Sequence, residues 1–218
     1  MTRPRYARFV GSRKHPRPLL PYFDPPMHLI EPHYAWEGLY QASEDPRSPL
    51  FAAENDLNSY SNTIYGYYIH PQWDSLESST LYLKILFADY DADHLAIIEL
   101  LGEWNDASEN DVRSLKRMIV DPLLKQGIRR FILIGENVFN FHGSDDEYYA
   151  EWFEEVDDEG GWVAALGFQE HVRREMALYH VDSYVNFGGQ LDTLAWRTFS
   201  PLQLAGVVDR LIQRRLGS

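Results

Sequence analysis

Residues 95–106 read LAIIELLGEWND, and residues 131–137 read FILIGEN. Both segments begin with an almost entirely apolar run, as expected of strands that are covered on both faces of a sheet. Between them, apolar residues recur at the 3.6-residue spacing of a helix, namely Val112, Leu115, Met118 and Ile119. A strand, a helix and a second strand form one βαβ unit, which predicts two parallel strands joined by a right-handed crossover.

The helix of this unit is predicted to be interrupted at Asp121-Pro122. Proline has no N–H group to donate to the carbonyl four residues back. The same pair suits a new helix start, with Asp121 as the cap and Pro122 at the first helical position. Gly127 predicts the end of the helix, because glycine adopts the left-handed conformation of a helix C-terminus.

Further strands flank this unit. Trp162–Leu166 and Tyr184–Phe187 predict two more parallel strands downstream. Upstream, Leu81–Phe87 is joined to Leu95–Leu101 by a short link, which predicts an antiparallel hairpin, and Thr63–His70 also has strand composition. The chain is therefore predicted to be an α/β protein with a mixed sheet, in which an N-terminal antiparallel hairpin is followed by βαβαβαβα units and helices pack on the sheet.

Two helix starts carry a specific signal. Ser144 with Glu147, and Ser200 with Gln203, have the spacing of a capping box, in which each side chain bonds to the backbone of the other residue. The helix that follows Ser200 carries one apolar face, formed by Leu204, Val208, Leu211 and Ile212.

The link of the hairpin contains Asp89, Asp91 and Asp93, a spacing that resembles the start of a calcium-binding loop. The sixth position of such a loop is glycine and the twelfth is glutamate, but here they are His94 and Leu100. The pattern therefore favours a solvated turn.

The chain divides by composition. Residues 1–33 hold seven of the twelve prolines, and residues 1–23 hold six basic residues and no acidic one, which predicts a basic, extended N-terminal arm. Residues 34–218 are expected to form a single domain. Within it, residues 34–80 are rich in aromatic residues and irregular in pattern, and we expect them to cover an edge or a face of the sheet.

Charge and composition exclude several classes of function. The formal net charge is −13, and an acidic body repels the phosphate backbone, so nucleic acid is not expected as a partner. The chain has no cysteine, which excludes disulfides, zinc–thiolate sites and cysteine nucleophiles. No apolar run reaches the roughly 18 to 20 residues that span a bilayer, so we expect a cytoplasmic protein without a membrane segment.

Several predicted strands end in glycine followed by polar residues, as at Gly102 and Gly135. Ligands of parallel sheets bind beyond the carboxyl ends of the strands. The candidate pocket at this edge comprises Glu103, Asn105, Asp106, Glu136, Asn137, His142 and Asp145.

This set of residues has two interpretations. Glu103 and Glu136 could share a proton, or could hold Mg²⁺ or Mn²⁺ together with His142. Alternatively, the same groups stabilise local structure, with Asp106 as a helix cap and Asn105 in a turn. No nucleotide-binding glycine loop, G-x-S-x-G or H-E-x-x-H motif is present, so no cofactor is evident and no catalytic residue is assigned.

Residues 95–155 contain a strand that ends in a glycine and an acid, a helix, a short apolar strand, a loop and a helix opened by serine. This order resembles the anti-sigma-factor-antagonist (STAS) domains. The resemblance implies a mixed sheet backed by helices, and a function through protein contacts that phosphorylation of the helix-opening serine switches. The matching residue is Ser144, but Asp145 and Asp146 stand where the family has small residues, and they would repel an added phosphate.

The segments IHPQWD (69–74), LLGEWND (100–106), ILIGENV (132–138) and WRTFSPLQL (196–204) resemble an uncharacterised bacterial family, and this resemblance implies no activity. We therefore expect a non-enzymatic interaction or regulatory domain, whose partner is another protein or a second copy of the chain. The alternative is a small-molecule-binding protein or a divalent-metal-dependent enzyme that uses the carboxylate-rich pocket.

Overall fold

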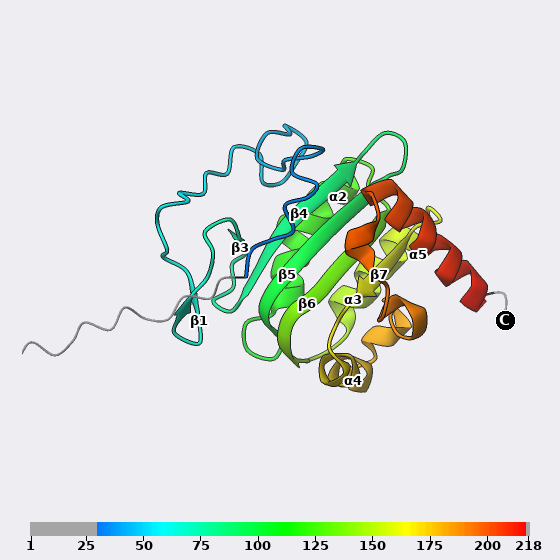
Figure 1. Cartoon of the computed structure of the whole chain (residues 1–218). Coiled ribbons are helices and arrows are strands. Elements are labelled where there is room, and N and C mark those ends of the chain that lie inside the picture. The colour runs from blue at the N-terminus through cyan, green and yellow to red at the C-terminus, as the bar shows by residue number, and fades with distance from the viewer. Residues whose placement is uncertain (1–29, 217–218) are drawn as a thin grey trace, which may run out of the picture.

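The computed structural model describes residues 30–216 (Figure 1). Its centre is a mixed sheet with the strand order β3-β4-β5-β6-β7. The strands are β3 (Asp74–Ser75), β4 (Leu81–Asp89), β5 (Leu95–Asn105), β6 (Arg130–His142) and β7 (Trp162–Leu166). β3, β4 and β5 are antiparallel neighbours, whereas β5, β6 and β7 run parallel. The predicted α/β class, the hairpin and the βαβ unit are confirmed. Residues 1–29 of the predicted arm lie outside the described residues.

β5 and β6 are longer than the sequence predicts. Sequence analysis ends these strands near Gly102 and Gly135, but their parallel pairing continues to Asn105 and His142. The register shifts between Glu99 and Leu101 and again between Gly102 and Glu103, and such bulges bend a pair of strands without ending it. A Cβ atom at Gly135 would lie 2.3 Å from the Phe168 ring, so this glycine makes room for packing within a strand.

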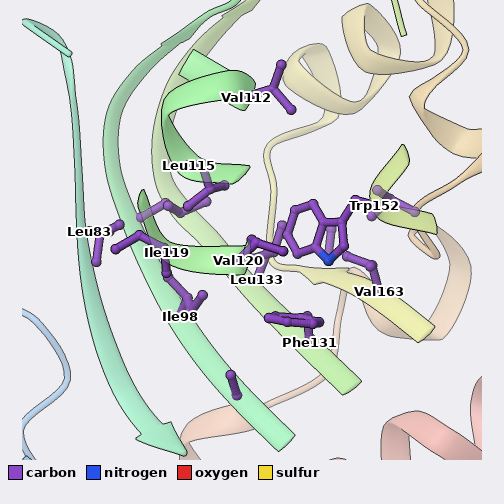
Figure 2. Close-up of a cluster of buried hydrophobic side chains, with 14 of the residues drawn as sticks. Leu83, Ile98, Val112, Leu115, Ile119, Val120, Phe131, Leu133, Trp152 and Val163 are labelled. Atoms are coloured by element: carbon purple, nitrogen blue, oxygen red, sulfur yellow. The ribbon is translucent and has the colours of Figure 1, made fainter. Parts of the chain in front are cut away.

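Short helices cover one face of the sheet, here called the α3 face. They are α1 (Asp111–Leu115), the π turn η1 (Lys116–Val120), α2 (Asp121–Lys125), α3 (Glu147–Asp157) and α4 (Glu170–Leu178). Figure 2 shows Leu115, Ile119 and Trp152 from these helices packed over strand residues such as Ile98 and Phe131. All five side chains are at least 99% buried, so this face holds the larger part of the apolar core.

The opposite face, here called the α5 face, is covered by α5 (Pro201–Leu216). Figure 1 shows this helix, in red, on the other side of the sheet from α2 and α3. Its buried residues pack against the first halves of the parallel strands. Within residues 30–216, no helix combines the length and the apolar character that crossing a bilayer requires.

The predicted break at Pro122 is replaced by a π turn. α1, η1 and α2 follow one another without a gap, and Val120 rather than Asp121 occupies the cap position of α2. A π turn already leaves a carbonyl without its usual partner, so the missing N–H of Pro122 removes no further hydrogen bond. The Asp121 carboxylate instead accepts a hydrogen bond of 2.6 Å from the fully buried Lys116 ammonium. Gly127 ends the helix with a φ of 96°, as predicted.

Two predicted strands are much shorter in the structure. The segment Thr63–His70 folds back on itself, and only β1 (Thr63–Ile64) and β2 (Tyr67–Tyr68) pair. Tyr184–Phe187 is reduced to one parallel bridge between Asn186 and Ala164. It is preceded by the 3-10 turn η2 (Val181–Ser183), which leaves too few extended residues for a strand.

The two capping boxes have different outcomes. Ser200 and Gln203 bond reciprocally at the start of α5, through contacts of 3.0 and 3.4 Å. The capping box predicted for Ser144 is wrong, because α3 begins three residues later, at Glu147. There the carboxylate of Asp145 accepts the N–H of Glu147 at 3.3 Å.

Residues 30–80, here called the cover segment, wrap the β4 edge of the sheet in turns and short strands (Figure 1). Trp36 and Trp73 are buried against the sheet, whereas Tyr34 and Tyr65 stay exposed. The indole N–H of Trp73 donates to the carbonyl of Ile30 at 2.8 Å. Some aromatic side chains of this segment therefore pack on the sheet, and others face solvent.

A substitution at Gly102 would test the close approach of β4 to β5 at this position. Its φ is 120°, and a Cβ atom there would lie 1.9 Å from the carbonyl oxygen of Thr80. We expect Gly102→Ala to lower the free energy of unfolding by roughly 3 kcal/mol or more, because both the backbone and the β4 contact become strained. Gly38→Ala, at a site with no atom within 4 Å of the added Cβ, is the matched control. Equal urea midpoints for the two variants would contradict this account.

Candidate functional site

On the α5 face, charged residues separate two apolar clusters. One cluster lies under α5 and includes Ile97, and the other lies under the β1–β2 hairpin and includes Leu101. Glu99 points to the same face as both, because side chains alternate along a strand with a period of two. The ion pairs of this region form two separate groups: Asp74 pairs with Lys84, and Arg197 pairs with Glu99 and Glu136. These five residues are here called the charged belt.

Glu99 is the most buried member of the charged belt, with 1% of its side chain exposed. It lies directly opposite Lys84 in the antiparallel pair of β4 and β5. Its Oε2 accepts the backbone N–H of His33 at 2.7 Å. Its Oε1 is buried without a hydrogen bond, and the Arg197 guanidinium lies 3.8 Å away. The loss of hydration of the Glu99 carboxylate is therefore only partly compensated by hydrogen bonds and ion pairs.

The Glu136 side chain is bound by two residues of the segment that precedes α5, Trp196 and Arg197. Its Oε1 accepts the indole N–H of Trp196 at 2.8 Å, and its Oε2 accepts a hydrogen bond from Arg197. Trp196 begins the 3-10 turn η4 (Trp196–Thr198), and the Arg197 guanidinium stacks 4.2 Å from the centre of its ring. The Arg197 side chain is 47% exposed, so the charged belt opens to solvent at this end.

Burial dominates the protonation of Glu99. Its pKa is raised from 4.5 to about 7, chiefly by loss of hydration and also by the nearby Glu136, against the opposing effects of the His33 N–H and Arg197. Burial and the Arg197 charge lower the pKa of His33. A carboxyl group that titrates near neutral pH beside an arginine and a second carboxylate is a common feature of functional sites.

The other end of the charged belt lies on β3 and β4. The Asp74 side chain is 7% exposed, and its Oδ1 accepts the Asn55 amide at 2.8 Å. The Lys84 ammonium lies 3.1 Å from Oδ2. The angles at this contact do not suit a hydrogen bond, so Oδ2 is buried without one. At this end of the charged belt, Asp74 and Lys84 therefore form an ion pair, and both side chains can still form further hydrogen bonds.

A cavity of about 230 Å³ lies between the cover segment and β4. Asp74, Lys84 and Asn55 provide polar walls, and His33 also contributes to the lining. The His33 ring itself packs against Trp36 and Trp196, with 4.9 Å between the ring centres in each case. The apolar lining includes Tyr40, Leu50, Leu57 and Leu86. The His33 Nε2 atom is buried and has no hydrogen-bond partner. His33 also connects the cavity to the buried carboxylate, since its backbone N–H bonds to Glu99.

The sheet register separates the two carboxylates that the sequence predicts to share a site. Glu103 lies opposite Asn140, four residues beyond Glu136 on the same strand. At about 3.3 Å per residue, this spacing corresponds to roughly 13 Å, too far for a shared proton. Glu103 instead accepts hydrogen bonds from Tyr65 and from the Asn140 amide, the latter at 3.1 Å. The prediction of one pocket that contains both carboxylates is therefore wrong.

Asp106 belongs to a separate, fully satisfied network on the α3 face. Its carboxylate accepts hydrogen bonds from the indole of Trp104, the backbone of Val112 and the hydroxyl of Tyr149, at 3.0, 2.8 and 2.7 Å. Burial raises its pKa to about 6, although these three donors oppose the rise. The bond to Val112 compensates an N–H in the first turn of α1. Asn110 rather than Asp106 occupies the cap position of α1. The Asp106 carboxylate nevertheless stabilises the start of this helix, which favours the structural interpretation of Asp106.

The remaining candidates lie at chain turns or in β6. The Asn105 carbonyl and side chain accept Glu109 and Ser108 N–H groups, so this residue forms a turn. Asn137 lies opposite Leu101, and His142 is exposed at the end of β6. Asp145 and Ser144 are exposed in the loop before α3. Within residues 30–216, no group of three or more histidine, aspartate or glutamate residues is arranged to hold a metal ion.

Sequence reasoning missed most of the charged belt. The sequence does carry a signal for two of its members, because Lys84 and Glu99 are the single charged residues of the apolar runs Leu81–Phe87 and Leu95–Leu101. In a hairpin, two such residues face each other when the register aligns them, and here they do. His33 and Arg197 gave no comparable signal, since they reach the sheet from irregular segments.

Comparison with protein-family models finds no match to this chain, and a search of curated proteins finds none either.

Glu99 should make stability depend on pH. Its folded-state pKa is raised, so the folded protein binds a proton more tightly than the unfolded chain, and stability falls as the pH rises from about 4.5 to about 7. Glu99→Gln removes this cost, which is on the order of 3 kcal/mol when fully developed. We therefore expect the variant to gain thermal stability over the natural protein at pH 8 and to gain less at pH 5, in melting curves followed by circular dichroism.

Glu175→Gln is the control for this prediction, because Glu175 lies at an exposed position of α4. It should leave the difference between the two pH values unchanged. A gain for Glu99→Gln that is the same at pH 5 and pH 8 would show that Glu99 does not titrate in this range.

Proposed function

We propose that this chain is a non-enzymatic domain that binds a small organic molecule in the cavity between the cover segment and β4. The observation that carries the proposal is an oppositely charged pair, the buried Asp74 and the half-buried Lys84, in the wall of a cavity that also has apolar walls. Ligand sites combine an apolar lining with a few polar groups that fix the orientation of the ligand. The cavity near β4 has both features.

The charged belt supports the same proposal. A stable core would place an apolar side chain at the position of Glu99, since a buried carboxylate that its neighbours only partly compensate lowers stability. Three carboxylates and two cations share this belt, and Glu99 keeps a buried oxygen without a hydrogen bond. Asp74 and Lys84 are the members of the belt that line the cavity, and Oδ2 of Asp74 is also buried without a hydrogen bond. Incompletely satisfied charge in a cavity wall is typical of sites that complete their interactions when a ligand binds.

A regulatory role through protein contacts stays a second proposal, as the STAS-like order implies. The loop that contains Ser144 lies beside an exposed apolar surface at the end of α4. Tyr179 packs its ring on Phe141, with centroids 6.2 Å apart, and Leu178 is 70% exposed. We propose a cytoplasmic location for either role, on the basis of the cysteine-free composition.

Filling the cavity should abolish binding without unfolding the protein. Ala53 is exposed and lines the cavity, so Ala53→Trp places an indole at its mouth. A panel of small metabolites would first be screened by thermal shift, and each compound that raises the melting temperature would be titrated calorimetrically into both proteins. We expect affinity for Ala53→Trp to fall by about tenfold or more, a change of about 1.4 kcal/mol.

The matched control is Ala107→Trp, at an exposed position after β5 that does not line the cavity. It should bind each compound as the natural protein does. A panel without a single binding compound, or equal affinities for the two tryptophan variants, would contradict the proposed site.

A further inference from the structure

We infer that the ligand of this cavity is a small zwitterion, namely a free amino acid or a close analogue with an apolar side chain. This inference rests on the proposed function and specifies the chemistry of the same site. It follows from three features of the walls: the paired charges, the unpaired polar atoms and the size of the apolar part.

The first feature is the charge of the wall. Asp74 and Lys84 form a pair of opposite sign, with 3.1 Å between the carboxylate oxygen and the ammonium nitrogen. A ligand with one charge would bind one member of the pair and leave the other less compensated. A ligand that carries both charges extends the pair into a ring of alternating sign, with its ammonium at Asp74 and its carboxylate at Lys84.

The second feature is the unused hydrogen-bonding capacity. Asp74 is only 6% exposed, and its Oδ2 atom is buried but accepts no hydrogen bond. The Lys84 ammonium has three donors, and its side chain is 29% exposed. An α-ammonium and an α-carboxylate supply the donor and the acceptor that these atoms lack.

The third feature is the size and apolar character of the remaining walls. The volume of about 230 Å³ is below the roughly 300 to 1,000 Å³ of sites for drug-sized ligands. It therefore suits a molecule of amino-acid size and excludes a nucleotide. Leu50, Leu57 and Leu86 line this part of the cavity, and Leu57 is 54% exposed. An aliphatic or aromatic ligand side chain would cover this leucine surface.

The test compares ligands that differ by one charge. Each of the twenty L-amino acids would be titrated into the full chain by calorimetry. For the apolar amino acid that binds best, the N-acetyl derivative removes the ammonium and the amide derivative removes the carboxylate charge. We expect each derivative to bind about tenfold more weakly or worse, and Ala53→Trp to weaken binding of the parent amino acid.

Variants of the pair should separate the two contacts. Asp74→Asn is expected to weaken binding of the amide derivative, which keeps the ammonium, and Lys84→Met to weaken binding of the N-acetyl derivative, which keeps the carboxylate. Lys125→Met, at an exposed position of α2, is the control and should change neither. The derivative series on the natural protein gives an answer even where a variant does not fold.

The outcomes distinguish this inference from the proposed function. Derivatives that bind as well as the parent amino acid would overturn the zwitterion. So would a metabolite of another class that binds better than every amino acid and is blocked by Ala53→Trp, although this result would support the cavity as a binding site. If neither the amino acids nor any panel compound binds, the inference and the proposed function both fail.

Discussion

The parallel pairing of β5 with β6 is the constraint on which the rest of the structure depends. It extends from Leu95 and Arg130 to Asn105 and His142, and both strands are buried over most of their length. Because the pairing fixes which residues share a face, it sends Phe131 into the α3-face core and Ile132 toward α5. The two bulges in this pairing also decide which acidic residues meet and which are kept apart.

The parallel pairing also forces a charged residue of the belt, Glu99, into a buried position that lowers stability. A carboxylate at Glu99 lies between two apolar clusters, and its raised pKa shows that lost hydration outweighs the help of its neighbours. Lys84 lies opposite Glu99 on β4, and the His33 N–H donates a hydrogen bond to the Glu99 carboxylate. The Arg197 guanidinium, however, lies 3.8 Å from this carboxylate. A fold selected for stability alone would not keep such a residue here. Local departures of this kind are expected where binding or chemistry takes place.

The sequence predicts the fold better than the site, for a physical reason. Apolar runs such as Leu95–Leu101 and Trp162–Leu166 carry a local signal that determines both strand and burial, and both were identified. Strand ends at Gly102 and Gly135 were misplaced, because a glycine in a bulge or under an aromatic ring looks the same in sequence as a glycine in a turn. The candidate pocket depended on those ends and so grouped residues that the register separates.

The backbone contact between His33 and Glu99 joins residues 66 positions apart. By contrast, the β4–β5 hairpin and the β5–β6 crossover connect segments that are neighbours along the chain. Closing a long loop costs more entropy before any contact is gained, so contacts between nearby segments form first. We therefore expect the β4–β5 hairpin and the β5–β6 unit to form before the segment around His33 docks on the sheet. The cavity is lined both by this segment and by β4, so it exists only where the two are in contact.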